Sequence, residues 1–341
     1  MEKKLRVGII GCGRIAVMHL NASTKLPQSI LVACCDTKID RANLACEKYG
    51  GKAYTDYKEM IAKENLDVVH ICLPHDQHVE ASVYALEKGL NVLCEKPMSI
   101  DYESAVKSVE VGKKSGKKHG IIFQCRYNPA TFYIVRKIKE GKLGKLISAH
   151  SLLTWSRPEE VHYVNSEWKG TWDKAGGGVL IDQAIHSIDL VNWIINSEVE
   201  SLKCTMSKNV CEKIAVEDTA TGVINYKNGV RYVFYATNTY PFDEPIKLEL
   251  RFENGKMEFN FDDVKINYKD GATEEFHAES RYEKVEGAKD YWTNAHIVQV
   301  EQFYNSVLGN CELEITAESV LPIHKMIFDL YKSAKSQETK I

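Results

Sequence analysis

A glycine-rich stretch near the start of the chain has the spacing of a phosphate-binding turn. Gly11, Gly13 and Ala16 follow a short apolar run and fit the pattern G-x-G-x-x-[GA]. The first glycine permits a tight turn, the second lets the backbone approach a pyrophosphate, and the small third residue keeps helix and strand close. The phosphates would lie at a helix N-terminus, where free N–H groups favour anions. We therefore predict dinucleotide contacts from Gly11, Cys12, Gly13, Arg14 and Ile15.

Asp36 is placed to choose the cofactor. It ends the second apolar run, 20 positions after Ala16. An acidic side chain at this place accepts hydrogen bonds from the adenosine ribose. Its charge would also repel a 2′-phosphate, although Lys38 and Arg41 follow closely enough to soften that preference. The cofactor predicted is NAD, with NADP less favoured.

Three ionisable residues are suited to the oxidation of an alcohol. Lys96 follows a short apolar run, and ligands bind at the carboxyl edge of open α/β sheets. Asp182 and His186 follow the glycine run 176–178 and share a helix face, since they are four positions apart. A histidine has a suitable ordinary pKa to accept the hydroxyl proton, and a lysine can stabilise the oxygen that gains charge. Lys96 could itself be the proton acceptor, its pKa lowered by burial, and the residues leave both assignments open.

As a set, these motifs resemble the glucose–fructose oxidoreductase / inositol dehydrogenase family (Gfo/Idh/MocA). The resemblance covers the glycine turn, Glu-Lys-Pro at 95–97, the G-G-G-x-x-x-D-x-x-x-H stretch at 176–186 and the C-terminal sheet. It implies a lysine–aspartate–histidine site at Lys96, Asp182 and His186, with His186 favoured as the base. It also implies hydride transfer between nicotinamide and a secondary hydroxyl of a sugar or cyclitol.

Three other functions stay open within this resemblance. One is a glycoside or nucleotide-sugar 3-dehydrogenase with a tightly bound NAD that is recycled between two substrates. Another is a lytic enzyme that oxidises a glycoside only transiently. The third is a dinucleotide-binding regulator without turnover, which we expect to lack the lysine or the histidine, whereas this chain has both.

The stretch His75-Asp76-Gln77-His78 allows two interpretations. Its histidines could suggest a metal pair, but no cluster with ligand spacing accompanies them, so no metal is expected. The resemblance implies a loop that borders the nicotinamide ribose, where the family often has Asn or Ser in place of His75. Further cofactor contacts are therefore expected from Leu73, His75, His78, Glu95 and Lys96.

Residues on the substrate side are predicted from an aromatic-rich loop and its surroundings. Aromatic faces with hydrogen-bonding neighbours suit a sugar ring, although packing between domains is the better interpretation of any single tryptophan. Asp189 could orient His186 or bind backbone, and Tyr291, Trp292, Asn294 and His296 could line the pocket. The predicted substrate contacts are Lys96, Arg126, Tyr163, Trp172, Asp182 and His186.

The order of apolar runs predicts two domains. Residues 1–124 alternate strands and helices, which indicates an N-terminal Rossmann domain with a parallel sheet. Residues 125–341 have long strand-like segments separated by Asn-Gly and Asp-Gly pairs, which indicate antiparallel hairpins. The fold class expected is α/β followed by α+β, with a mostly antiparallel open sheet in the substrate-binding and oligomerisation domain. A homodimer or homotetramer is expected through that sheet, with Val223, Tyr232 and Phe234 on its outer face.

Composition restricts the possible partners and location. The 341 residues are 44% hydrophobic and 27% charged with a net charge of −3, which is typical of a globular protein. We expect no nucleic-acid partner because no basic stripe is visible, and no membrane span because no apolar run approaches ~20 residues. Ten cysteines without a C-x-x-C pair, and no secretory leader, favour reduced thiols in the cytoplasm.

Overall fold

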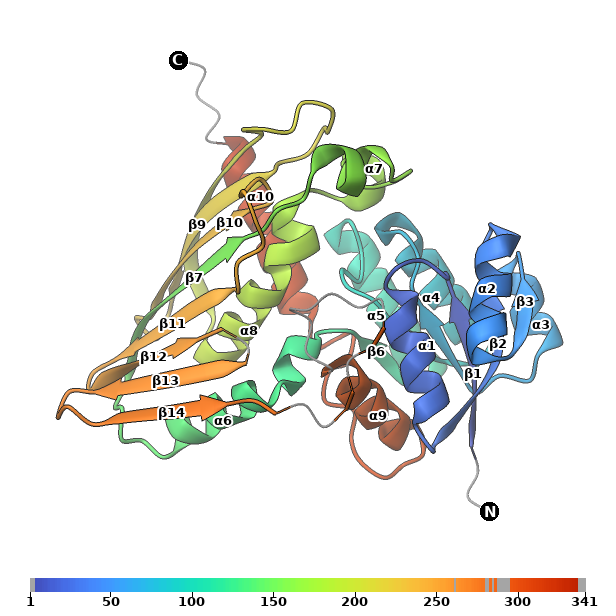
Figure 1. Cartoon of the computed structure of the whole chain (residues 1–341), viewed down its shortest axis with the longest axis horizontal. Helices are drawn as coiled ribbons and strands as arrows, with labels where there is room; N and C mark the ends of the chain where they lie inside the picture. The colour runs from blue at the N-terminus through green and yellow to red at the C-terminus, as the bar shows by residue number, and fades with distance from the viewer. Residues whose placement is uncertain (1–3, 261, 280–281, 284, 287–294, 337–341) are drawn as a thin grey trace. The chain divides into compact units, whose positions relative to one another are not determined.

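The chain folds into two compact units. The computed structural model describes residues 4–336 except 261, 280–281, 284 and 287–294 (Figure 1). Unit 1 is Met1–Gln124 with Arg281–Leu321, and unit 2 is Cys125–Ser280 with Pro322–Ile341. The expected second domain, 125–341, is therefore corrected: after unit 2 has begun, the chain returns to unit 1 for residues 281–321.

Helix α9 (Ala295–Val307) explains this return to unit 1. The Gln299 side chain donates to the Ile121 carbonyl at 2.8 Å and accepts from the Phe123 N–H at 3.0 Å, so it continues the hydrogen bonding of the sheet edge. Phe303 and Tyr304 are buried in the same apolar core as the first strand. Sequence periodicity predicted this helix but gave no information about which core it joins.

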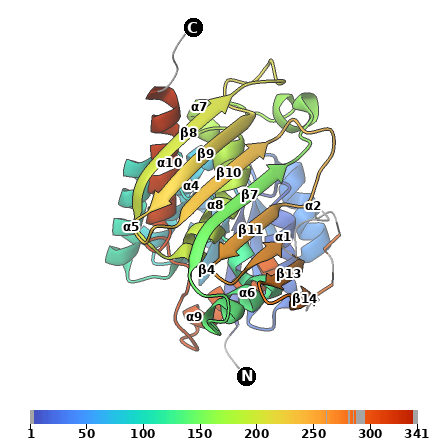
Figure 2. The same ribbon diagram turned by 90° about the vertical axis from the view of Figure 1, so that its left-hand side faces the viewer.

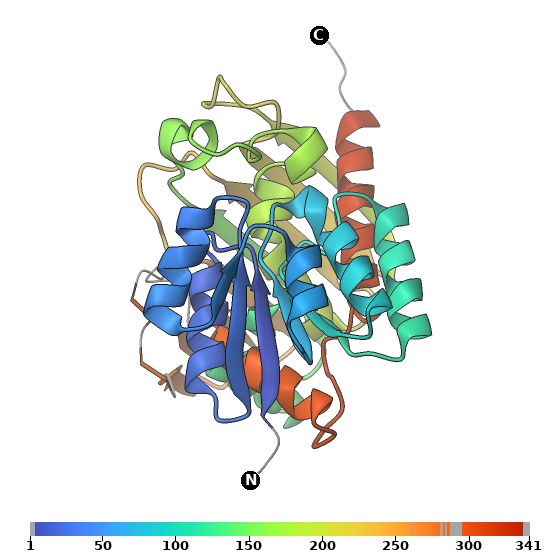
Figure 3. The ribbon, with the colours of Figure 1, turned by 90° about the vertical axis from the view of Figure 1, so that its right-hand side faces the viewer.

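Unit 1 is a parallel sheet with helices on both sides (Figure 3). Its strand order is β3-β2-β1-β4-β5-β6, and all its pairs are parallel, which confirms the Rossmann prediction. Because both faces are covered, the central strands are continuous apolar runs. The elements are β1 (Leu5–Ile10), α1 (Ala16–Lys25), β2 (Ser29–Cys35), α2 (Ile39–Tyr49), β3 (Lys52–Tyr54), α3 (Tyr57–Lys63), β4 (Val68–Ile71), α4 (His78–Glu87), β5 (Asn91–Cys94), α5 (Tyr102–Ser115) and β6 (His119–Ile121).

Unit 2 is built on an eight-stranded sheet of order β14-β13-β12-β11-β7-β10-β9-β8. All neighbours are antiparallel except β7 and β10, which confirms the mostly antiparallel prediction. Helices α6, α8 and α10 lie on one face (Figure 1), and the other face is open (Figure 2). The strands are β7 (Leu146–Thr154), β8 (Val199–Ser207), β9 (Thr219–Tyr226), β10 (Arg231–Thr237), β11 (Lys247–Phe252), β12 (Gly255–Phe259), β13 (Asp263–Tyr268) and β14 (Thr273–His277), and the helices are α6 (Pro129–Lys139), α7 (Trp172–Ala175), α8 (Ile185–Ile195) and α10 (Leu321–Ser336).

Two residues predicted on the outer face of this sheet, Tyr232 and Phe234, lie on the face that the helices cover. Tyr232 and Phe234 are 0% and 1% exposed and pack toward the helices, whereas Val233 and Tyr235 are 38% and 37% exposed. Tyr232 is fixed there by its hydroxyl, which lies 2.6 Å from the Ser151 hydroxyl. Side chains alternate along a strand, so an error of one position places a residue on the wrong face.

Candidate active site

The glycine turn between β1 and α1 has the shape of a phosphate cradle. Gly11 has φ +92°, and a Cβ there would lie 2.5 Å from the Cys72 carbonyl oxygen, so no other residue fits. No described heavy atom lies within 4 Å of where a Cβ of Gly13 would be, which leaves room for a ligand at that point. The N-cap of α1 is Ile15, whose side chain cannot accept a hydrogen bond, and the first turn holds no acid. The first N–H groups of α1 thus suit a pyrophosphate.

Asp36 is held in a fixed orientation beside this turn. One carboxylate oxygen accepts from the Cys12 N–H at 3.0 Å, and the other accepts from the Lys38 N–H at 2.9 Å. Each oxygen retains a second lone pair, so the side chain can still accept hydrogen bonds from ribose hydroxyls. The turn and Asp36 together fit NAD.

The loop after β4 contains a histidine, His78, that bridges two main-chain carbonyl groups. His78 is buried, with Nδ1 2.7 Å from the Pro97 carbonyl and Nε2 2.8 Å from the Leu73 carbonyl. Burial lowers the pKa of His78, although both carbonyls oppose the shift. Its ring nitrogens therefore connect the loop at Leu73 to the loop after Lys96, and a contact with the cofactor stays a prediction. His75 is also buried, with its ring centroid 5.8 Å from that of His78.

Lys96 follows β5 and is buried, as is Glu95 beside it. The Glu95 carboxylate lies 2.9 Å from Nε2 of His19 and 3.5 Å from Nε2 of His296, and it accepts from the Lys96 N–H at 3.2 Å. Burial raises the pKa of Glu95, but the hydrogen bonds from the two histidines outweigh burial and hold it well below 4.5. The partners given for the Glu95 carboxylate lie inside unit 1, and its contact with the cofactor stays a prediction.

In unit 2, Asp182 lies in a polar cluster. Its carboxylate is 2.9 Å from Nζ of Lys169 and 3.7 Å from Nε2 of His162, and it accepts from the Gln183 amide at 2.6 Å. Burial lowers the pKa of His162 to about 4, so that imidazole is neutral near pH 7. Asp182 belongs to a π-helical turn, Leu180–Ala184, that continues into α8 with His186 in its first turn. The predicted helix over 179–195 is therefore two segments of different geometry.

A buried glutamate that the sequence reasoning missed anchors this segment. The Glu217 carboxylate accepts from the N–H groups of Gly178 and Leu180, each at 3.0 Å, and from the Tyr331 hydroxyl at 2.7 Å. A Cβ at Gly178 would lie 1.8 Å from the Glu217 carbonyl oxygen. The glycine run thus admits the close approach of another backbone segment. The only signal for Glu217 in the sequence was an acidic pair before a strand, which is weak.

Arg126 was predicted to contact the substrate, and Asp189 to orient His186 or bind backbone. In the structure the two side chains form an ion pair with each other. The guanidinium donates to Asp189 through Nε at 2.8 Å and through a second nitrogen at 2.5 Å, and it lies over the Trp193 ring. Burial raises the pKa of Asp189, and Arg126 opposes the shift. This two-pronged geometry is the strong form of an arginine–carboxylate contact. Arg126 is therefore a partner of Asp189 instead of a demonstrated substrate contact.

Tyr163 and Trp172 also have packing roles. Tyr163 is buried with Cys211, Ile214 and Val216, and its hydroxyl accepts from the Asn238 amide at 2.6 Å. The Trp172 ring packs against this cluster and donates through Nε1 to the Ala215 carbonyl at 2.8 Å. Both side chains therefore pack within unit 2, and their contact with substrate stays a prediction. Tyr291, Trp292 and Asn294 lie outside the described residues, whereas His296 is described and lies beside Glu95.

Comparison with known proteins agrees with this arrangement. Residues 5–123 match the oxidoreductase family with an NAD-binding Rossmann fold, and residues 133–258 match the GFO/IDH/MocA C-terminal domain. The chain belongs to the Gfo/Idh/MocA oxidoreductase family, and it is an NAD-dependent oxidoreductase of that family.

Individual relatives are dehydrogenases with known polyol substrates. The chain is 29% identical to myo-inositol 2-dehydrogenase of Thermotoga maritima over 253 residues, 72% of each chain. It is 27% identical to D-glucoside 3-dehydrogenase of Escherichia coli over 97% of this chain and 96% of that one. The WlbA dehydrogenase of Bordetella pertussis, solved with NADH and UDP-GlcNAcA, has a TM-score of 0.83 at 23% identity over 98% and 97% of the two chains, which shows a shared fold. Among the described residues, no helix combines the length and apolar character needed to cross a bilayer.

Proposed function

We propose that this chain transfers a hydride between NAD and a secondary hydroxyl of a sugar, glycoside or cyclitol. The observation that carries the proposal is that a member of this family has both a fitting dinucleotide turn and all three residues Lys96, Asp182 and His186. A regulator without turnover has no need for these three ionisable residues.

The proposed division of labour follows from the chemistry of each side chain. NAD, when bound, supplies the carbon that accepts the hydride, and the glycine turn and Asp36 would hold it. His186 takes the hydroxyl proton, and Lys96 donates a hydrogen bond to the oxygen on which charge develops. Asp182, beside Lys169, accepts a hydrogen bond from a neighbouring hydroxyl of the substrate. The alternative, in which Lys96 is the proton acceptor, predicts that turnover depends on Lys96 and not on His186.

The substrate class is tested by a screen for NADH formation. Purified protein with NAD is offered cyclitols, free hexoses, methyl glycosides and UDP-sugars, and absorbance of NADH is followed. The relatives named above suggest the cyclitols, glycosides and UDP-sugars, and the D-glucoside relative, which matches 97% of this chain, makes oxidation at a glycoside C3 the second candidate. We expect reduction of NAD in at least one class, and NADP to be used less well. Absence of reaction in all four, with bound NADH detectable by its fluorescence, would refute the dehydrogenase proposal.

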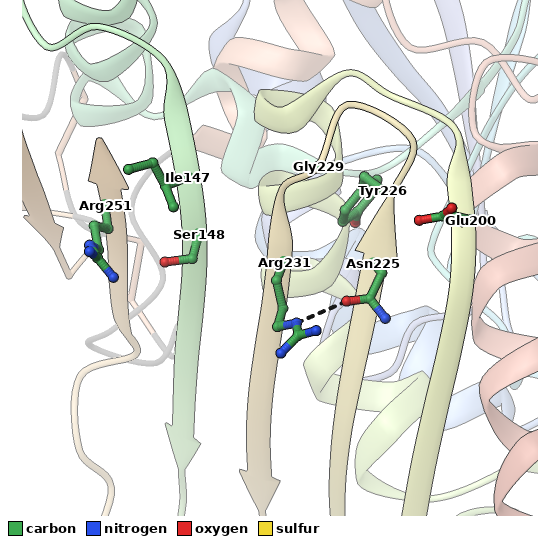
Figure 4. A pocket seen from close by; sticks show the side chains of 8 residues that line it. All are labelled: Ile147, Ser148, Glu200, Asn225, Tyr226, Gly229, Arg231 and Arg251. Atoms are coloured by element: carbon green, nitrogen blue, oxygen red, sulfur yellow. Dashed lines mark hydrogen bonds between the residues drawn. The ribbon is translucent and has the colours of Figure 1, made fainter. Parts of the chain in front are cut away.

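We also propose that the open face of the unit 2 sheet is covered by a second copy. Leu152 pairs in register with Tyr235, and Val233 lies two positions before Tyr235 on the same face of β10. These exposed side chains therefore form one apolar patch. Beside them is a hollow of about 660 Å³ with Arg231, Ser148 and Arg251 on adjacent strands (Figure 4). An exposed apolar sheet face is typical of an assembly surface.

Light scattering of wild type and of Tyr235→Arg tests this surface. We expect a dimer or tetramer for wild type and a smaller species for the variant, with an unchanged unfolding temperature. A monomeric wild type at micromolar concentration would end this proposal.

A cytoplasmic location is consistent with ten cysteines that are all free thiols in the structure.

A further inference from the structure

A continuous chain of hydrogen bonds runs through the interior of unit 1 and ends beside Lys96. The Glu95 carboxylate lies 2.9 Å from His19 Nε2, and His19 Nδ1 lies 2.9 Å from His70 Nδ1. His70 Nε2 lies 3.1 Å from the Tyr304 hydroxyl, which in turn lies 3.0 Å from the Ser23 hydroxyl. These five side chains come from α1, β4, α9 and the residue that follows β5, and all are buried. Such a buried polar chain is stable only if every donor has an acceptor.

The donor and acceptor of each hydrogen bond in this chain can be assigned in turn from Ser23. Ser23 donates its single hydroxyl proton to the His19 carbonyl at 2.8 Å. Tyr304 must then be the donor to Ser23, so its oxygen accepts from Nε2–H of His70. A neutral His70 has an acceptor at Nδ1, which requires a proton on Nδ1 of His19. The 2.9 Å contact between His19 Nε2 and Glu95 needs a proton as well. Because the hydrogen bonds from the histidines hold the pKa of Glu95 well below 4.5, Glu95 is a carboxylate and His19 carries both protons.

One competing arrangement satisfies the same contacts with one proton fewer. If Ser23 turned its proton to Tyr304, all bonds would reverse, and His19 would be neutral with its proton on Nε2. Glu95 would then be a buried carboxylate whose partner His19 is a neutral donor. A buried charge without an opposite charge is costly, whereas an imidazolium compensates it. The two arrangements therefore differ in a property that can be measured, the number of protons on His19.

We infer that His19 is doubly protonated, forms a buried ion pair with Glu95, and through Glu95 positions the main chain at Lys96. The last link is the Lys96 N–H, which donates to the second carboxylate oxygen of Glu95 at 3.2 Å. Because His19 neutralises Glu95, compensation of this buried carboxylate does not depend on the Lys96 ammonium. His296, with Nε2 3.5 Å from the same carboxylate, supports the ion pair from α9. The positioning role rests on the proposed function, whereas the ion pair does not.

The protonation state can be read without any enzyme assay. In protein labelled with ¹⁵N-histidine, a long-range ¹H–¹⁵N correlation spectrum distinguishes an imidazolium from both neutral tautomers. We expect an imidazolium pattern that disappears in His19→Gln, distinct from that of the exposed His277 beside Asp263. If that variant does not fold, Glu95→Gln provides the assignment, since loss of the carboxylate should convert the same pattern to a neutral one. A neutral pattern for His19 in the wild type would overturn the ion pair.

Kinetics test the positioning role, with a matched control from the same unit. His19→Gln keeps an N–H donor for Glu95 but cannot carry the second proton, and His19→Ala removes both. We expect kcat to fall by about tenfold in His19→Gln and further in His19→Ala, since small displacements of catalytic groups are costly, with KM for NAD unchanged. His119→Gln is the control, because His119 is also buried and its ring nitrogens have no hydrogen-bond partner among the described residues.

The outcomes distinguish failure of the positioning role from failure of the proposed function. A native kcat in His19→Ala, with an active wild type, would overturn the positioning role. An equal loss in His119→Gln would do the same, because it would show a general response to changes in the core. If wild type reduces NAD with none of the polyols, the proposed function is what fails, and the histidine spectrum still decides the ion pair.

Discussion

Each unit has one buried glutamate beside a proposed catalytic residue, and the two glutamates are neutralised differently. Glu95 in unit 1 has two histidines within hydrogen-bonding or ion-pair distance, and its pKa lies well below 4.5 because their hydrogen bonds outweigh burial. Glu217 in unit 2 accepts from two backbone N–H groups and a tyrosine, and burial keeps its pKa raised. An ionisable donor can supply a full charge, whereas neutral donors supply only dipoles.

This difference indicates two ways of fixing a site residue. Glu217 holds the N-terminal end of the segment that carries Asp182 and His186, so its role is to shape the backbone. Glu95 adjoins Lys96 directly and belongs to a chain that can hold a proton. We therefore expect replacement of Glu217 to change mainly stability, and replacement of groups near Glu95 to change mainly turnover.

The largest effect is expected at the residues that the two glutamates support. Lys96→Met should lower turnover about 100- to 1000-fold, because a donor to the developing oxyanion is lost. His186→Ala should lower it about 100-fold or more, because the proton acceptor is lost. NADH affinity, measured by fluorescence titration, should stay near native in both, and Lys114→Met, at an exposed lysine of α5, serves as the control. Near-native turnover in His186→Ala together with a dead Lys96→Met would make the lysine the proton acceptor.

Glu217→Leu tests the structural role of the second glutamate. The change leaves the N–H groups of Gly178 and Leu180 and the Tyr331 hydroxyl without their buried acceptor. Each such group costs about 1–3 kcal/mol, so we expect the free energy of unfolding to fall by about 3 kcal/mol or more. Urea unfolding measures it, and Glu217→Gln, which keeps one acceptor oxygen, should lose less. Equal stability of Glu217→Leu and wild type would contradict the anchoring role.

The two glutamates should give pH dependences of opposite sign. The lowered pKa of Glu95 means that its stabilising contribution is present above pH 4.5 and is lost as pH falls through the lowered value. The raised pKa of Glu217 means that its contribution is present below 4.5 and is lost as pH rises through the raised value. Each unit of pKa difference corresponds to about 1.4 kcal/mol.

Urea unfolding across acid pH measures both dependences. The stability advantage of wild type over Glu95→Gln should grow as pH rises toward 4.5, and its advantage over Glu217→Gln should shrink as pH rises above 4.5. If both differences changed in the same direction, the contrast between the two carboxylates would be wrong.

The sequence was informative where a pattern repeats and uninformative where a single contact decides. Continuous apolar runs predicted the parallel strands, and turn pairs predicted most hairpins, because many residues carry those signals. The strand β14 was missed, and the face of Tyr232 was assigned wrongly, because one position of shift reverses a strand's faces.

Partners distant in the chain explain the contacts at the site that the sequence did not indicate. Arg126 and Asp189 are 63 positions apart, and His19 and Glu95 are 76 apart. Each residue has a plausible chemistry of its own in the sequence. Only the fold shows that Asp189 forms an ion pair with the Arg126 guanidinium and that His19 contacts the Glu95 carboxylate.

The smallest predicted effect concerns Asp182, which has a basic partner as Glu95 does but is partly open to solvent. The side chains of Asp182 and Lys169 are 14% and 24% exposed, and their contact is 2.9 Å. If Asp182 binds a substrate hydroxyl, Asp182→Asn should raise KM for the polyol about tenfold, the loss expected for a hydrogen bond to a charged group, with little change in kcat. Lys169→Met should raise KM less, because it removes only the partner that orients the carboxylate. The two changes combined should then be no worse than Asp182→Asn alone, a coupling of about 1 kcal/mol. Lys174→Met, at an exposed lysine of α7, should leave KM unchanged. Additive effects in the double variant would show instead that Lys169 contacts the substrate itself, and unit 2 would then contribute a cation of its own to the reacting sugar.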